Sequence, residues 1–408
     1  MQPDAQLISV AGDNHVHSDE SSLGVRAKLT GRRVAISGLY YSGLLRIADR
    51  LAGSHNLNRR AGDTVPRLRR SNGSKFGILC YHRVGTGGIP LFSQLAPRTF
   101  EAQMRHIRKH FRVVPLGQLC REMHEGLPVK PTLAVTFDDG YRDLYTHAFP
   151  VLREYQIPAT IYLIGECMET GEVPWYDRIF LALKVAVGST LEQELDSPRR
   201  FNLVSPSARA AAAWEIVSYL KTVSNLQRLN WCDAFERRIP LPQQDLQGRM
   251  LDWQQVREMS RGGIFFGAHT MSHPVLSRLE GPTVEVELLS SKRLLEQGLG
   301  RSVEEFAYPF GKPEDWGVHS QDLLKRCGYR SAVTTSYGLN TTGMSVFRLR
   351  RYQIGDENSL PGFAFNLSRM FLEGAEGEPA SSTIDTSSCV GHSGAGTELH
   401  AQVERIGT

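Results

Sequence analysis

Long apolar runs are missing from this chain. No stretch of its 408 residues approaches the roughly 18 consecutive apolar residues that cross a bilayer. Residues 1–24 are polar and acidic, without the basic and then apolar order of a secretory signal. We therefore expect a cytoplasmic protein, with an envelope-associated location as the alternative.

A concentrated charge of one sign is also missing. The formal net charge is +4, and no basic stripe or recognised module indicates a partner nucleic acid. The mildly apolar segment 34–51 carries scattered arginines and fits an amphipathic helix. Such a helix either packs on the folded domain or lies on a membrane surface, and we favour packing because its polar face is not strongly basic.

Closely spaced cysteines are the third absence. The six cysteines are far apart and form no Cys-x-x-Cys pair or dense framework, so reduced thiols are the simplest account, although an even count leaves disulfides open. They are Cys80, Cys120, Cys167, Cys232, Cys327 and Cys389.

The composition is that of a globular protein, with 41% hydrophobic and 22% charged residues. We predict a disordered leader over 1–30, then an N-terminal helix and basic linker over 31–74. One folded domain is expected over 75–365. A C-terminal tail over 366–408 is predicted to be disordered, because it is Gly/Ser/Thr/Glu-rich from residue 374 onward.

Apolar runs and helical patterns alternate along the predicted domain, which indicates an α/β fold with a parallel sheet. Periodicity alone does not separate an open sheet from a barrel. A helical insertion is predicted at about 167–247, as a cap over the strand ends. The expected strands are Phe76–Tyr81, Leu133–Phe137, Thr160–Ile164, Ile264–Ala268, Glu305–Tyr308 and Ser331–Thr335.

Two of these runs end in residues that bind metals. Asp138 and Asp139 follow the first, and Gly140 allows a sharp exit from the strand. His269 and His273 follow the second, on a strand-to-loop turn. Taken singly, the first is also an ordinary surface turn and the second a chance histidine pair. Together, a carboxylate and two imidazoles make a three-ligand site that leaves coordination open for water and substrate.

Three segments resemble the motifs of a known family, the polysaccharide deacetylases of the NodB-homology type (carbohydrate esterase family 4). The resemblance runs from about residue 76 to about residue 354 and implies a distorted, incomplete (β/α) barrel. The segments are Thr136-Phe137-Asp138-Asp139-Gly140, His269-Thr270-Met271-Ser272-His273-Pro274 and Phe306-Ala307-Tyr308-Pro309-Phe310-Gly311.

The resemblance implies a role for each motif. Asp138 would be the catalytic base, and Asp139 with the two histidines would hold a divalent ion, with zinc expected first and cobalt or nickel as alternatives. The reaction would be hydrolysis of N-acetyl groups on the amino sugars of an exopolysaccharide, its precursor or an oligosaccharide. Tyr308, Pro309 and Phe310 would bind substrate, with a backbone N–H near Phe310 at the oxyanion.

The third motif departs from the family pattern. Many members carry there an arginine that orients the catalytic aspartate, but Ala307 stands near that position. Arg351 is our candidate substitute, and its alternative is a solvated surface arginine.

The family's late Leu-x-His motif, which supplies the proton-donating histidine, is not evident either. His82, which follows the first strand-like run, is our candidate for that role by resemblance to members that act on exopolysaccharides. Its alternative is a buried structural histidine.

Two aromatic residues open the predicted insertion. Trp175 and Tyr176 are candidates for stacking against sugar rings, although packing in a core is the more ordinary use of such residues. Two other functions remain open for the chain. One is a non-catalytic glycan-binding or scaffold protein of a polysaccharide assembly system, and the other is an O-acetyl esterase.

Overall fold

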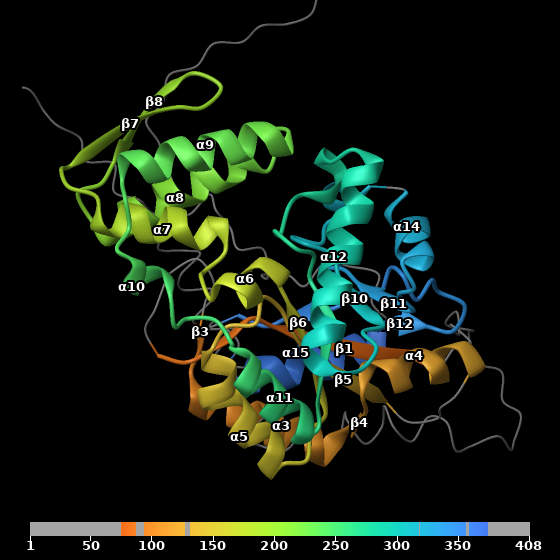
Figure 1. Cartoon of the computed structure of the whole chain (residues 1–408). Coiled ribbons are helices and arrows are strands. Elements are labelled where there is room, and N and C mark those ends of the chain that lie inside the picture. Colours follow the sequence, from red (N-terminus) through yellow and green to blue (C-terminus); the bar gives the residue numbers. More distant parts are fainter. Residues whose placement is uncertain (1–74, 87–93, 127–130, 318, 356–358, 374–408) are drawn as a thin grey trace, which may run out of the picture.

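The computed structural model describes residues 75–86, 94–126, 131–317, 319–355 and 359–373 (Figure 1). The predicted leader at 1–30, the helix and linker at 31–74 and most of the predicted tail therefore lie outside the described residues. Within the described part, no helix has the length and apolar character needed to cross a membrane.

A nine-stranded mixed sheet forms the centre of the described chain, with its main path in the order β11-β10-β9-β6-β5-β1-β12. Neighbours from β11 to β1 are parallel, and β12 is antiparallel to β1. The two ends of this path, β11 and β12, are not paired with each other, so the barrel is incomplete, as expected. Its strands are β1 Lys75–Tyr81, β5 Thr132–Phe137, β6 Ala159–Leu163, β9 Ile264–Ala268, β10 Glu305–Ala307, β11 Ser331–Val333 and β12 Asn340–Thr341, with β4 Arg112–Val113 beside β5 and β13 Tyr352–Gln353 beside β1. The six predicted strands are confirmed to within two residues at each end.

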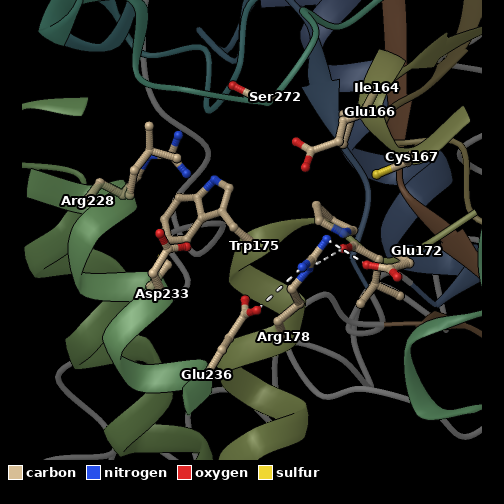
Figure 2. A pocket seen from close by; sticks show the side chains of 14 residues that line it. Ile164, Glu166, Cys167, Glu172, Trp175, Arg178, Arg228, Asp233, Glu236 and Ser272 are labelled. Atoms are coloured by element: carbon tan, nitrogen blue, oxygen red, sulfur yellow. Dashed lines mark hydrogen bonds and ion pairs between the residues drawn. The ribbon is translucent and has the colours of Figure 1, made fainter. Parts of the chain in front are cut away.

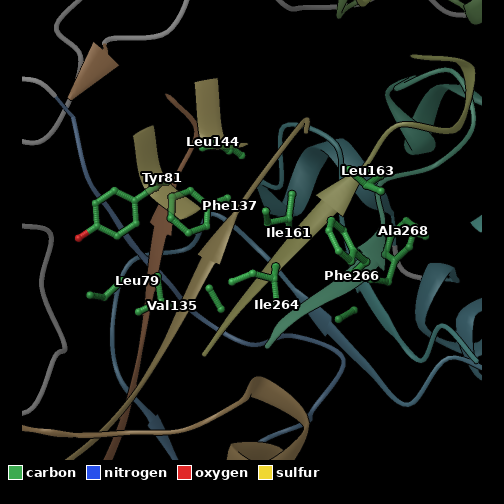
Figure 3. Close-up of a cluster of buried hydrophobic side chains, with 14 of the residues drawn as sticks. Leu79, Tyr81, Val135, Phe137, Leu144, Ile161, Leu163, Ile264, Phe266 and Ala268 are labelled. Carbon is green, nitrogen blue, oxygen red and sulfur yellow. The ribbon is translucent and has the colours of Figure 1, made fainter. Parts of the chain in front are cut away.

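Alternate side chains of four neighbouring strands pack on one face of this sheet. Figure 3 shows them side by side across β1, β5, β6 and β9. Successive residues of a strand point to opposite faces, so this apolar set fixes the register of all four strands. The carboxyl ends of the strands then meet at one edge, where Tyr81 pairs with Phe137 and Leu163 pairs with Ala268.

Helices connect and cover the strands. Phe100, Met104 and Ile107 are buried on α3, and Val284 and Leu288 are buried on α12, so apolar residues three or four apart form the face by which each helix packs on the domain. The elements outside the insertion are β2 Arg83–Val84, β3 Gln94–Leu95, α3 Pro97–His110, α4 Leu116–Glu125, η1 Leu144–Ala148, α5 Phe149–Glu154, α6 Gly165–Thr170, α11 Trp253–Arg261, η2 Leu276–Arg278, α12 Gly281–Leu299, α13 Pro313–Trp316, α14 Ser320–Arg326 and α15 Leu360–Glu373.

The insertion is not purely helical, which corrects our prediction for 167–247. It contains an antiparallel hairpin, β7–β8, in which Leu191 pairs with Phe201 and both are buried. In both strands of the hairpin a single apolar residue stands among mostly polar and charged neighbours, and this alternation is too weak to predict a strand. In Figure 1 the insertion forms its own layer at the upper left, with α7 facing the strand ends. Its elements are α7 Trp175–Val185, β7 Thr190–Glu194, β8 Pro198–Asn202, α8 Pro206–Leu220, α9 Asn225–Arg238 and α10 Gln243–Leu246.

The predicted boundary between domain and tail at 365/366 is also wrong. Helix α15 continues to residue 373, and its side chains at Phe363, Leu367 and Phe371 are buried against the domain. Lys75 at the start of β1 donates a hydrogen bond to the carbonyl of Phe371 at 3.0 Å. Apolar residues four apart hold this helix on the domain, and the polar composition begins only after the helix, at residue 374.

Candidate active site

The two adjacent aspartates leave the end of β5 in different directions. Asp139 and Gly140 both have positive φ, 70° and 80°, so the strand ends in a left-handed turn as predicted. A side chain at Gly140 would meet Leu163 Cδ2 at 2.5 Å, which is why a glycine is needed there. The turn directs Asp138 toward Arg351 and Asp139 toward the histidine pair.

The histidine pair lies on an irregular loop after β9, as predicted. His273 has a positive φ of 52°, and its backbone N–H donates to Thr270 Oγ1 at 3.0 Å. Glu287 of α12 also holds this loop. Its carboxylate accepts hydrogen bonds from the backbone N–H groups of Met271 and Ser272 at 2.8 and 3.0 Å, and from the Ser272 hydroxyl at 2.7 Å. The loop geometry is therefore fixed from two sides.

Asp139, His269 and His273 bring their ligand atoms together. These atoms lie within 4.8 Å of one another, and all three residues are buried. The Asp139 carboxylate oxygen Oδ1 is 3.6 Å from His269 Nε2 and 3.7 Å from His273 Nε2. The chain thus brings the three predicted metal ligands to one point.

The chemistry of this set fits a divalent cation. His269 Nδ1 lies 2.7 Å from the carbonyl of Ala307 and donates to it, which leaves Nε2 with a lone pair directed at the cluster. The two Nε2 atoms are only 3.2 Å apart. Burial raises the pKa of Asp139, to which the charge of Asp138 adds, and burial lowers the pKa of both histidines. A bound cation would relieve the close lone pairs and favour the ionised carboxylate.

The guanidinium of Arg351 forms a two-point ion pair with the Asp138 carboxylate. Its Nη1 and Nη2 each donate to one carboxylate oxygen at 2.7 Å, and its Nε donates to the Thr334 carbonyl at 2.7 Å. The side chain is fully buried, which excludes the surface alternative for Arg351. Burial alone would raise the pKa of Asp138, but the charge and hydrogen bonds of Arg351 outweigh it and hold the pKa well below its usual range. Arg351 therefore occupies the orienting position expected for it.

His82 and Cys80, at the end of β1, face the same carboxylate. His82 Nε2 lies 3.9 Å from Asp138 Oδ2, and the Cys80 thiol donates to that oxygen at 3.7 Å. Burial lowers the pKa of His82 to about 4, so the imidazole is neutral at pH 7. Sequence reasoning missed Cys80, although residues two apart on a strand share a face. With Arg351 paired to Asp138, this group is a poor cation site and a good one for proton transfer.

Two residues of the third motif lie deeper than the predicted substrate-binding role suggests. Tyr308 is fully buried, and its hydroxyl donates to the Phe347 carbonyl at 3.1 Å, so it packs in the core. Pro309 is also buried. Each follows β10 into the packed interior, which their position after an apolar strand could have indicated. Of the three predicted substrate residues, Phe310 is the one that contacts His273, with a φ of 60° and its ring centroid 4.8 Å from that of His273.

Trp175 and Tyr176 lie mostly inside the protein, which favours the packing alternative over the predicted stacking on sugar rings. They are 8% and 1% exposed. The Trp175 indole N–H donates to the His273 carbonyl at 3.1 Å, and the Tyr176 ring lies 5.0 Å from the His273 ring. Both pack at the start of α7 against the candidate metal site, so the core-packing alternative holds for them.

Comparison with known proteins agrees with this architecture. Residues 126–332, about half of the chain, match the family described as polysaccharide deacetylase. YxkH of Bacillus subtilis, provisionally named a polysaccharide deacetylase, is 20% identical over 319 residues, which cover 77% of this chain and 84% of YxkH. The Streptococcus pyogenes deacetylase PplD, solved with acetate, is 20% identical with a TM-score of 0.50 over 73% of this chain and 99% of PplD, and so shares the fold.

A shorter match links the chain to a deacetylase named for an N-acetylglucosamine polymer. The poly-beta-1,6-N-acetyl-D-glucosamine N-deacetylase of Staphylococcus epidermidis is 28% identical over 124 residues. The match covers 27% of this chain and 42% of that enzyme, less than half of its length. From the matched family, the shared fold and the arrangement of the three motifs, the chain belongs to the polysaccharide deacetylase family of hydrolases.

Proposed function

We propose that the protein is a metal-dependent hydrolase that removes N-acetyl groups from the amino sugars of an exopolysaccharide, its precursor or a derived oligosaccharide. The observation that carries the proposal is the division of labour between two adjacent carboxylates. Asp138 is held ionised by Arg351, while Asp139 joins two neutral imidazoles. A base beside an open metal site is what hydrolysis of an unreactive amide requires.

Asp139, His269 and His273 would hold the ion, and zinc suits their mixed oxygen and nitrogen donors, with cobalt and nickel as alternatives. When bound, a divalent ion lowers the pKa of water and polarises the amide carbonyl. Three protein ligands leave room in the coordination sphere for both of these partners.

Asp138 accepts the proton of the attacking water as the oxygen adds to the acetyl carbon. The proton passes to His82, whose Nε2 is 3.9 Å from Asp138 and whose pKa, about 4, lies above that of Asp138. His82 then protonates the departing amine as the carbon–nitrogen bond breaks, which gives acetate and a free amino sugar. Arg351 keeps the aspartate ionised and correctly oriented before each cycle.

The proposed substrate rests on the relatives. The matched enzyme of Staphylococcus epidermidis is named for poly-beta-1,6-N-acetyl-D-glucosamine. The matching segment covers 27% of this chain. We therefore take an N-acetylglucosamine polymer as the first substrate to test. An intact base and ligand set argues against a purely glycan-binding role, because a scaffold has no use for them.

The test is to incubate the purified protein with zinc, cobalt or nickel and an N-acetylglucosamine oligomer, and to measure released acetate. The control is Asp138→Asn, which keeps the shape of the side chain and removes the base. We expect metal-dependent acetate release that falls by about 10²- to 10⁴-fold in the variant, while bound metal is unchanged. A fully active Asp138→Asn variant would contradict the mechanism, and acetate with a free hydroxyl in place of a free amine would identify an esterase.

A further inference from the structure

The first turn of α7, residues 175–177, contacts both metal-binding turns although it belongs to the insertion. Trp175 donates its indole N–H to the backbone carbonyl of His273 at 3.1 Å. This bond is made inside the protein, since the two residues are 8% and 3% exposed. A buried hydrogen bond to a backbone carbonyl fixes the position of the residue that carries it.

Tyr176 approaches the same site from the adjacent position. Its ring meets the His273 ring edge to face, with centroids 5.0 Å apart, and the side chain is 1% exposed. Its hydroxyl lies in the same buried cluster as the Asp139 carboxylate, close enough for the two groups to interact. Tyr176 therefore lies beside a candidate ligand from each of the two motifs.

Asp177 extends the contact to the far side of the first motif. Its Oδ2 accepts a hydrogen bond from the Tyr141 hydroxyl at 2.9 Å, and Tyr141 follows Gly140 directly. The guanidinium of Arg83 lies 4.6 Å from the centre of the Tyr141 ring and covers it. Three consecutive residues of the insertion thus hold three separate points of the candidate metal centre.

The outer side of α7 is itself anchored. Figure 2 shows Arg178 between two carboxylates, Glu172 before the helix and Glu236 on α9, with N···O distances of 3.0 and 3.5 Å. Above it, the buried guanidinium of Arg228 lies 4.9 Å from the centre of the Trp175 ring. Helix α9 therefore supports the first turn of α7, which contacts the candidate metal ligands.

We propose that the insertion helps to position the metal ligands. Trp175 and Tyr176 are positioning residues that hold His273 and Asp139 in their ligating geometry. The inference rests on the proposed metal site and adds to it. Groups that hydrogen-bond to metal ligands fix the ligand orientation, and their loss typically costs about 10- to 100-fold in metal affinity. The insertion would then contribute to metal binding.

The test uses Tyr176→Phe, which removes one hydroxyl and keeps the ring. Affinities for Zn²⁺ and Co²⁺ are measured by competition with a chelator, together with the visible absorption of the Co²⁺ protein and the melting temperature of the metal-free protein. We expect affinity about 10- to 100-fold weaker and an altered Co²⁺ spectrum, with the metal-free melting temperature close to wild type. Tyr155→Phe, after α5, removes a hydroxyl that interacts with Glu101 and Arg105, and as the matched control it should change neither the metal affinity nor the spectrum.

Trp175→Phe is the second variant, since it removes the indole donor to His273 and keeps an aromatic ring, although a smaller one, beside Arg228. It should also weaken metal binding, and it keeps the inference testable if Tyr176→Phe folds poorly. Wild-type affinity and spectrum in both variants would overturn the inference, as would a loss of stability without any change in metal binding. A wild-type protein that binds neither ion would instead overturn the proposed metal site itself, so the two failures are distinguishable.

Discussion

At the scale of single residues, the candidate site depends on two neighbouring carboxylates that have opposite surroundings. Asp138 meets the buried guanidinium of Arg351, and Asp139 meets two neutral imidazoles. The sequence predicted both residues and the partners of each, because the types and positions carry the chemistry. It did not reveal Cys80, nor that Tyr308 is committed to the core, since both depend on which face of a strand is buried.

Arg351→Lys tests the grip on the base. A lysine keeps the positive charge but cannot donate to both carboxylate oxygens in the planar fork that arginine provides. We expect kcat to fall by about 10²-fold, because a small misplacement of a catalytic group is costly, while metal content stays at the wild-type value. Steady-state kinetics and metal analysis check this, with Arg350→Lys as the neighbouring control. An unchanged kcat would remove Arg351 from the mechanism.

At the scale of elements, the strand ends and the loops that follow them hold the site. Strand patterns placed the strands well, because apolar runs bounded by turns are strong indications of strands. The contact between α12 and the second motif was not predictable, since Glu287 reads as an ordinary exposed position of an amphipathic helix. Helix α15 was cut short in our prediction, although its apolar stripe at Phe363, Leu367 and Phe371 comes before the polar composition that begins at residue 374.

Glu287→Ala tests the support that α12 gives to the histidine loop. The change leaves the backbone N–H groups of Met271 and Ser272 without their acceptor. We expect unfolding free energy to drop by about 1–3 kcal/mol and metal affinity to weaken as well. Denaturant unfolding and chelator competition measure both, and Glu285→Ala, paired with Arg326 at the surface of the same helix, is the control. If the two variants had the same unfolding free energy and the same metal affinity, Glu287 would not be needed to hold the histidine loop.

At the scale of the whole molecule, the insertion is joined to the domain through the first turn of α7. The sequence indicated that an insertion exists and where it lies, since it separates the first two motifs. It could not indicate that Trp175 and Tyr176 turn inward, because an aromatic pair at the start of a helix suits a sugar platform and a core equally well. Only the surroundings supplied by Phe310 and His273 decide between these uses.

Asp177 makes the stability of this junction depend on pH. Burial raises the pKa of Asp177 to about 7 from an ordinary value of 3.8. Between about pH 4 and pH 7 the unfolded chain loses this proton and the folded chain keeps it, so stability falls as pH rises through that window. The full effect is at most about 4 kcal/mol.

Asp177→Asn, which resembles the protonated form, should remove this part of the decline. Melting temperatures measured from pH 4 to pH 8 should therefore show the variant gaining on the wild type as pH rises. A constant difference between the two proteins across this range would contradict the assignment of the pKa to Asp177.

The central claim is that this chain hydrolyses the acetamido groups of an amino-sugar polymer with a divalent ion held by Asp139, His269 and His273. The most direct measurement counts acetate and free amine released from poly-β-1,6-N-acetylglucosamine by the protein, first stripped of metal by a chelator and then reloaded with zinc. We expect acetate and free amine in equal amounts from the zinc-reloaded protein, and neither product from the metal-free protein. Equal release by the stripped protein, or acetate without amine, would contradict it.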